Sequence, residues 1–412
     1  MLQYGWERAT GTTLIRGARQ LLTLRGPRGP RRGRDLNELG ILHDGALLIR
    51  DGVLLDVGPT RRVENLAEAR GAVEINALGR VVMPGFVDSH THLVFPPAGA
   101  KASDHAGAVR SIHTCSARLL ANRAQLHLET MARHGTTTME VKTGCGPDDT
   151  AELKVLRALA DFHGHPVDVL PTFLMRLPEA GTAGELERTA AAAWFASDLL
   201  PRIHRRELAL YADLVWDPDP AMYPLFLQYL EAARVLGFGR KIHAGPAASS
   251  GEVLTAVENG ALSIDHLERA EPAELSLLAR GSTVATLLPC ASFCEGTPPP
   301  PARALVDGGA AVALATNFNP QHSPMASMQS VVSLACLRMG LTAGEAISAA
   351  TINGAFALGL ADRVGSLERG KSADLLLLNI SDYRELATHL GVNLVHLTMK
   401  RGEFIYREGK VT

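Results

Sequence analysis

Short apolar segments of strand length follow one another between Phe86 and Thr316, and helical patterns lie between most of them. Parallel strands need a connection that crosses back over the sheet, and a helix is the usual one. Eight such strand–helix units are typical of a (β/α)8 TIM barrel, a fold of the α/β class. The predicted strands cover residues 86–90, 136–142, 167–174, 213–216, 241–243, 262–266, 283–288 and 312–316, and the clearest helices 116–133, 150–163, 183–196, 222–236 and 251–259.

The two ends of the chain have a different pattern. Strand-like runs, with an Asp51-Gly52 hairpin signal between two of them, fill the N-terminal part. Strand-like runs return at 373–379 and 396–399, after a predicted helix at 342–358. We expect both ends to form one small β-sandwich into which the barrel is inserted. The predicted domains are residues 1–83 with 360–412 for the sandwich, and 84–359 for the barrel.

Composition and charge exclude some classes of partner. The 412 residues are 46% hydrophobic with a formal net charge of -2, so nothing indicates a nucleic acid or an acidic membrane surface. The chain has no apolar run of membrane-spanning length and no signal-peptide pattern at its start. Five scattered cysteines are typical of free thiols, so we expect a cytoplasmic protein. The basic run at 25–34 is expected to be a solvated loop rather than a binding arm.

Histidines stand at the ends of several predicted strands. His90 and His92 follow an apolar run, and residues two apart on a strand share a face, with Cα atoms about 7 Å apart. His243 ends the fifth strand, His266 ends the sixth and Asn317 follows the eighth. Barrel active sites lie at these carboxyl ends. Three neutral imidazoles and one oxygen ligand suit one divalent transition metal ion with a position left for water.

The motifs around these residues resemble the amidohydrolase superfamily and, within it, the imidazolonepropionase family, the ring-opening enzymes of histidine degradation. Residues 82–92, 134–144, 263–268, 313–320, 323–324 and 370–375 carry the resemblance, which runs through nearly the whole chain. It implies a metal-dependent hydrolase that opens the C–N bond of a cyclic amide. It also implies zinc or iron on His90, His92 and His243, with His266 facing the substrate carbonyl, and a homodimer.

Several positions depart from that family's pattern. Asn317 stands where the family has an aspartate that meets the metal and moves a proton, and a neutral amide cannot take a proton. Gly245-Pro246 replaces the family's acidic residue after the fifth strand. The substrate-gripping arginine appears as Lys101, the tyrosine after the second strand as Cys145, and the histidine after the third as Arg176. Lys101 and Arg176 are candidates to meet an anionic small-molecule substrate, and the predicted substrate-binding set is Lys101, Cys145, Arg176 and Asn319.

Two interpretations follow from these departures. In the first, the chain is a hydrolase with an altered proton shuttle, and His322, five residues after Asn317, is a candidate base because imidazole titrates in the right range. Glu140 and Asp217 are further candidates, although each of these side chains also has an ordinary structural explanation. In the second, proton transfer is lost and the chain is a catalytically impaired small-molecule binding protein. The retained histidines favour the first interpretation.

Overall fold

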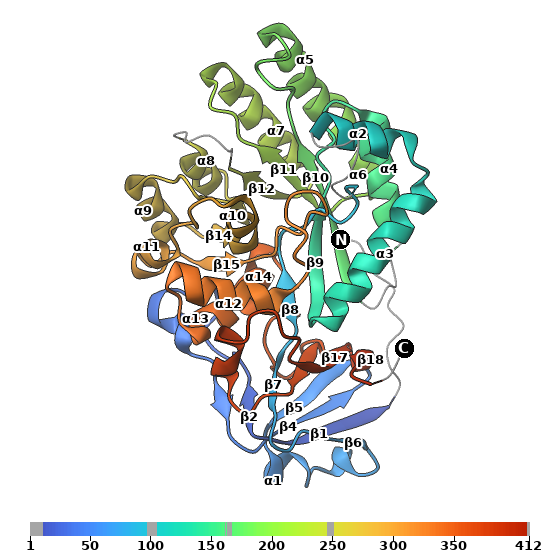
Figure 1. Cartoon of the computed structure of the whole chain (residues 1–412), viewed down its shortest axis with the longest axis vertical. Helices are drawn as coiled ribbons and strands as arrows, with labels where there is room; N and C mark the ends of the chain where they lie inside the picture. Colours follow the sequence, from blue (N-terminus) through green and yellow to red (C-terminus); the bar gives the residue numbers. More distant parts are fainter. Residues whose placement is uncertain (1–10, 97–104, 161, 163–166, 245–250, 410–412) are drawn as a thin grey trace.

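The computed structural model describes residues 11–96, 105–160, 162, 167–244 and 251–409. One eight-stranded parallel sheet forms a barrel, and two smaller sheets lie at one end of it (Figure 1). The predicted TIM barrel with a terminal β-sandwich is confirmed. The barrel strands are β8 (Phe86–Asp88), β9 (Thr136–Lys142), β10 (Asp168–Met175), β11 (Tyr211–Val215), β12 (Gly239–His243), β13 (Ser263–Asp265), β14 (Val284–Leu287) and β15 (Val312–Leu314).

The barrel closes between its first and last strands. Thr91 forms an isolated parallel bridge with Phe318, and the His92 amide donates to the Phe318 carbonyl at 2.7 Å. The Asp88 carboxylate also accepts from the backbone N–H of Thr316 at 3.0 Å and from its hydroxyl at 2.7 Å. Closure therefore depends on the same residues that follow β8 and β15 into the candidate site.

Burial on both faces explains the sequence of the barrel strands. Every residue of β9 and β10 is buried, because one face of each strand meets the barrel interior and the other meets the helices. The helices are amphipathic instead. In α3 (Ala117–Arg133), Leu120, Ala124 and Leu128 recur at four-residue spacing on the buried face. The Ser116 hydroxyl caps this helix by accepting from the Leu119 amide at 3.2 Å.

Most predicted helices are present, and several were not predicted. The predicted helix at 342–358 is two helices, because Thr351 leaves the helical backbone and its hydroxyl donates to the Ile347 carbonyl at 2.6 Å. These two helices are α13 (Ala343–Ala349) and α14 (Ile352–Ala357). Besides them and α3, the barrel region has α2 (His105–Thr114), α4 (Asp149–Ala160), α5 (Glu185–Trp194), α6 (Leu200–Arg205), α7 (Tyr223–Val235), α8 (Glu252–Glu258), α9 (Pro272–Arg280), α10 (Pro289–Glu295), α11 (Ala302–Asp307) and α12 (Met328–Met339).

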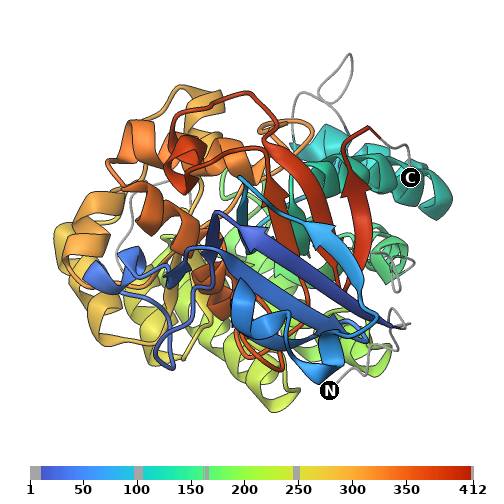
Figure 2. The same ribbon diagram turned by 90° about the horizontal axis from the view of Figure 1, so that it is seen from below.

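Strands from both ends of the chain build the sandwich. One sheet has the order β5-β4-β1-β6 and the other β18-β17-β16-β7-β2-β3, so N-terminal and C-terminal strands lie side by side (Figure 2). The domain bounds stay a prediction. The strands are β1 (Thr12–Ala18), β2 (Gln20–Leu22), β3 (Ile41–Leu42), β4 (Gly45–Arg50), β5 (Val53–Pro59), β6 (Val73–Asn76), β7 (Val81–Pro84), β16 (Leu375–Leu378), β17 (Val395–Lys400) and β18 (Glu403–Arg407), with α1 (Thr60–Val63) after β5.

Two arginines of the basic run at 25–34 do not belong to a solvated loop. Arg31 is 2% exposed, and its guanidinium donates to the carbonyls of Pro27 at 2.7 Å and Leu24 at 3.0 Å. Arg32 donates to the carbonyls of Gly281 at 2.6 Å and Gly309 at 3.0 Å. The expectation of a solvated run is wrong for these two residues, because both guanidinium groups donate to backbone carbonyls.

A buried ion cluster joins the sandwich to the barrel. The Lys400 ammonium of β17 lies 2.5 Å from Asp374 Oδ2 and 2.7 Å from Asp168 Oδ2 at the start of β10. Its Nζ also contacts the Thr138 hydroxyl of β9 at 3.2 Å. Ion pairs as well as apolar contacts therefore hold the two domains together. Within the described part of the chain, no helix has the length and apolar character needed to cross a membrane.

Candidate metal centre

Four histidines converge at the carboxyl end of the barrel. His90 and His92 follow β8, His243 is the last residue of β12, and His266 comes directly after β13. The ring centre of His90 lies 5.2 Å from that of His92, 5.1 Å from that of His243 and 5.6 Å from that of His266. The rings of His243 and His266 are 4.5 Å apart. The strand-end histidines predicted from the sequence are thus brought together.

The nitrogens of this cluster are arranged as ligands for one ion. β8 ends at Asp88, earlier than predicted, yet His90 Nε2 and His92 Nε2 are 3.3 Å apart. Two nitrogens bound tetrahedrally to one zinc ion, at about 2.0–2.1 Å each, would be separated by about 3.3 Å. Ligand atoms of His90, His243 and His266 also lie within 4.8 Å of one another. The Nδ1 atoms of His92 and His243 are buried and have no hydrogen-bond partner among the described residues.

The imidazoles are held in the neutral form that binds metal. Burial and, second to it, the nearby Lys142 ammonium lower the pKa of His90 to about 4. Burial also holds the pKa values of His92 and His243 well below their usual range. A neutral imidazole has a free lone pair, so no proton must leave these rings before a cation binds. Donor type, spacing and charge therefore all fit a divalent transition metal ion.

His266 differs from the other three histidines. Burial lowers its pKa, but the surrounding carboxylates together raise it more, so the net shift is upward. Glu268, whose Oε2 lies 3.4 Å from His266 Nδ1, contributes most among them, and Asp265 and Glu295 add to it. The backbone is also unusual, since His266 has a φ of 80° and the following Leu267 a φ of 74°. Left-handed backbone is strained for such side chains and concentrates at functional sites. The raised pKa favours the protonated imidazole, so His266 can act as a hydrogen-bond donor.

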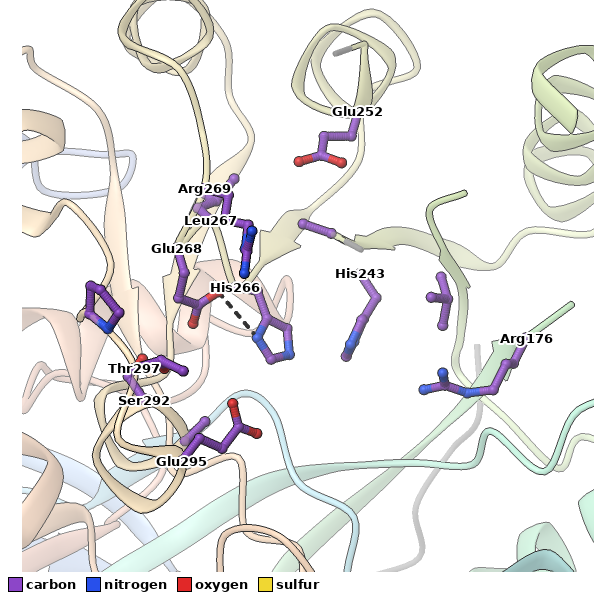
Figure 3. Close-up of a pocket in the computed structure, with 14 residues that line it drawn as sticks. Arg176, His243, Glu252, His266, Leu267, Glu268, Arg269, Ser292, Glu295 and Thr297 are labelled. Atoms are coloured by element: carbon purple, nitrogen blue, oxygen red, sulfur yellow. Dashed lines mark ion pairs between the residues drawn. The ribbon is translucent and has the colours of Figure 1, made fainter. Parts of the chain in front are cut away.

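A cavity of about 620 Å³ opens beside His243 and His266. Figure 3 shows Arg176 pointing toward His243 from one side, whereas Glu268 and Glu295 lie on the side of His266. Burial lowers the pKa of the Arg176 guanidinium, and its Nε has no hydrogen-bond partner in the described part of the chain. The polar residues that line the cavity are Arg176, His243, Glu252, His266, Glu268, Arg269, Ser292, Glu295 and Thr297.

The other predicted substrate-binding residues are placed differently. Cys145 is 4% exposed, and its backbone N–H donates to Glu152 at 2.6 Å. Asn319 is part of a turn in which its side-chain oxygen accepts from the Gln321 amide at 2.9 Å. Lys101 lies outside the described residues. Arg176 is therefore the one member of the predicted set that lines this cavity within the described ranges, and the roles of all four stay predictions.

Asn317 comes directly after β15 in a constrained loop. Its φ is 49°, which is left-handed and is better tolerated by asparagine than by most residues. On either side of it, Thr316 bonds to Asp88 and the Phe318 carbonyl bonds to the His92 amide. Its backbone is thus tied to the segment that carries His90 and His92. Its side chain as a metal ligand stays a prediction.

The candidate bases predicted from the sequence are not equivalent. His322 is exposed in the loop after β15. Glu140 is fully buried and is paired with Lys241 at 2.5 Å and with the Thr172 hydroxyl at 2.5 Å. Asp217 is paired with the Arg188 guanidinium. Both carboxylates are therefore engaged by cations, whereas His322 stays a prediction as the base.

Sequence reasoning assigned no role to four acidic residues of the site. Asp265 accepts from His90 Nδ1 at 2.8 Å, and Glu252, Glu268 and Glu295 line the cavity. Asp265 directly precedes His266 at a strand end, and this position was the available signal. Glu252 opens α8 after a loop and Glu295 ends α10, so no strand-end position marked either of them.

Comparisons with known proteins place these observations in a family. The family model described as "Amidohydrolase family" matches residues 81–163 and 225–405. The imidazolonepropionase of Symbiobacterium thermophilum is 38% identical, covering 97% of this chain and 98% of the relative. That of Rubrobacter xylanophilus is 37% identical, covering 95% and 98%. A crystal structure of atrazine chlorohydrolase from Arthrobacter aurescens TC1, complexed with zinc, has a TM-score of 0.74 at 18% identity, covering 96% of this chain and 95% of that one.

Proposed function

The chain belongs to the amidohydrolase family, and we propose that it is a hydrolase that opens the C–N bond of a cyclic amide on one divalent transition metal ion, zinc or iron. The observation that carries this proposal is the approach of His90 Nε2 and His92 Nε2 to 3.3 Å beside a cavity of about 620 Å³. A cavity of this size accommodates a small molecule. The nitrogen pair fits a metal ion, and the curated relatives are imidazolonepropionases.

His90, His92 and His243 would hold the ion, and the amide oxygen of Asn317 is the candidate fourth ligand. An ion of this kind acidifies water and polarises a carbonyl oxygen when it is bound. The neutral state of the three imidazoles supports this ligand set.

His266 would orient the substrate carbonyl. Its Nδ1 faces Glu268, which leaves Nε2 to donate to a carbonyl oxygen in the cavity (Figure 3). A donor aimed at an oxygen that gains negative charge in the transition state lowers the barrier more than it tightens ground-state binding. Its place between the metal ligands and Glu268 supports this role.

The two sides of the cavity favour a substrate with two different polar ends. Arg176 offers a guanidinium that can grip an anionic group such as a carboxylate. Glu268 and Glu295, on the opposite side of the histidines, can accept from the N–H groups of an amide ring (Figure 3). We therefore propose a small cyclic amide with an anionic tail as the substrate.

A binding protein that has lost catalysis is not favoured, because the histidines and the cavity are both retained. His322 remains the proposed base in place of the family's aspartate. We also propose that the chain is cytoplasmic and that it acts as a homodimer. Light scattering on the purified protein would test the dimer. A monomer at micromolar concentration would contradict the dimer.

Metal content tests the proposed function directly. The protein is purified without added metal or chelator, and zinc and iron are measured by elemental analysis. We expect about one equivalent per chain in the wild type and a large loss in His90→Ala, because a catalytic zinc site is typically held by three protein ligands. His322→Gln, which changes a histidine outside the ligand set, is the matched control and should keep its metal. No metal in the wild type, even after reconstitution, would contradict the proposal.

A further inference from the structure

Lys142, the last residue of β9, is a fully buried cation among carboxylates of three strands. Its Nζ lies 2.5 Å from Asp213 Oδ2, 2.7 Å from Asp265 Oδ2 and 3.3 Å from Glu140 Oε1, and all four side chains have no exposure. A buried ammonium is costly unless it is paired and hydrogen-bonded. The barrel interior is therefore built around this charge, directly beneath the histidines.

Asp265 connects this cation to the candidate metal centre. The same oxygen, Asp265 Oδ2, accepts from Lys142 Nζ and from His90 Nδ1, the latter at 2.8 Å. The other oxygen accepts from the Ser263 hydroxyl at 3.0 Å. Lys142 and Ser263 thus fix the carboxylate on both sides. Because Asp265 accepts a hydrogen bond from His90 Nδ1–H, Nε2 is the unprotonated nitrogen of the neutral ring, and it faces His92 Nε2.

We infer that Lys142 is a positioning residue of the metal centre: its ammonium holds Asp265 in the orientation that directs His90 Nε2 toward the ion. This inference rests on the proposed function, since it takes His90 to be a metal ligand. Partners that orient a metal-binding histidine are worth about 10–100-fold in metal affinity. Lys142 acts one step further out, through Asp265, and its loss leaves that carboxylate free to turn away from His90.

Lys241 provides a matched control in the same barrel. It is as deeply buried as Lys142, and its Nζ lies 2.5 Å from Glu140 Oε2 and 3.4 Å from the Ser89 carbonyl. Its ion pair therefore goes to Glu140 rather than to the carboxylate that orients His90. Removing Lys241 takes away an equally buried cation while leaving the contacts between Lys142, Asp265 and His90 in place.

The experiment compares Lys142→Met and Lys241→Met with the wild type. Zinc affinity of the metal-free proteins is measured by competition with a chromogenic chelator, and the visible absorption of the cobalt(II)-loaded proteins reports ligand geometry. We expect Lys142→Met to weaken zinc binding by about 10–100-fold and to change the cobalt spectrum. Lys241→Met should match the wild type. Wild-type affinity and spectrum in Lys142→Met, or equal losses in both variants, would overturn the inference.

A second variant keeps the inference testable if Lys142→Met does not fold. Lys142→Met leaves the buried Asp213 carboxylate without its partner. The double variant Lys142→Met with Asp213→Asn removes one positive and one negative charge together, so the net charge of the barrel interior does not change. The double variant should show the same loss of zinc affinity, and wild-type affinity there would overturn the inference. Failure of the proposed function looks different, because the wild type itself would then bind no zinc.

Discussion

Asn317 shows how much can depend on one side-chain atom. It follows β15, beside Thr316 and Phe318, which are tied to the β8 segment. An aspartate at this position could both bind the ion and carry a proton, whereas an asparagine can only offer a neutral oxygen. We therefore propose that the chain combines its histidine cluster with an altered group for proton transfer.

Replacing Asn317 with aspartate tests this combination. We expect Asn317→Asp to raise turnover on any cyclic amide that the wild type opens slowly, because a positioned proton-transfer group contributes about 10²–10⁴-fold. The measurement is kcat on a panel of cyclic amides at constant metal content. No gain would mean that another group already moves the proton, or that the cavity no longer admits these substrates.

His322 is the candidate for that other group. If it serves as the base, His322→Gln should lower kcat by about 10²–10⁴-fold, while the metal content stays at the wild-type level because His322 is not a ligand. Elemental analysis and initial rates on the same preparation check both points. Unchanged rates would remove His322 from the mechanism, and a loss of metal would show that it supports the ion instead.

At the scale of a helix, α4 brings a buried acid to the loop after β9. Glu152 lies in the first turn of α4, is fully buried, and accepts from the Cys145 amide at 2.6 Å. Its other oxygen has no partner in the described ranges of the chain. Burial raises the pKa of Glu152 to about 8. Near pH 6, the folded protein therefore carries a protonated carboxyl where the unfolded chain carries a carboxylate.

This difference predicts how stability depends on pH. An unfolded glutamate titrates at about 4.3, so between that pH and about 8 the folded state binds one proton more than the unfolded state. The contribution of Glu152 to the free energy of unfolding is complete below this window and falls as pH rises through it. Relative to Glu152→Gln, the wild type should lose about 2 kcal/mol between pH 6 and pH 8 in urea unfolding. Parallel pH dependences for the two proteins would contradict this prediction.

The whole molecule is held together across its two domains. Gly135, between α3 and β9, has a φ of 95°, and a Cβ there would lie 2.8 Å from a methyl group of Leu376 in the sandwich. The Lys400 cluster lies across the same boundary, with Asp374 on the sandwich side and Asp168 on the barrel side. The barrel and sandwich therefore share contacts that neither could make alone.

Lys400→Met tests the ion cluster at this boundary. Methionine has a similar length but no charge, so buried Asp374 loses its cationic partner, whereas Asp168 keeps its ion pair with Arg401. Breaking a buried pair typically costs about 3–5 kcal/mol. Denaturant unfolding should show a loss of this order. Arg62→Met is the control, because its pair with Asp56 lies at the surface, partly exposed and screened by water. Similar losses in the two variants would argue against a special role for the boundary cluster.

Much of the architecture could be predicted because it depends on local pattern. The strand β9 was predicted at Thr136–Lys142 and is found there, since β-branched residues such as Thr136–Thr138 and Val141 favour a strand. The break at Thr351 and the short helices α9 to α11 were missed. Hydrogen bonds and packing determine where these helices begin and end, and the hydrophobic periodicity of the sequence does not show them.

The sequence alone determined that histidines would gather at one end of a barrel, because parallel strands in chain order bring their carboxyl ends to the same rim. Only the tertiary structure decided which charges reach them. Asp265, Lys142 and Arg176 belong to three different strands or the loops after them, and their contacts depend on stagger and side-chain direction around the closed sheet. The physical reason is separation along the chain. The side-chain pattern of a strand depends on neighbouring residues, whereas the partner of a buried charge lies far away in the sequence.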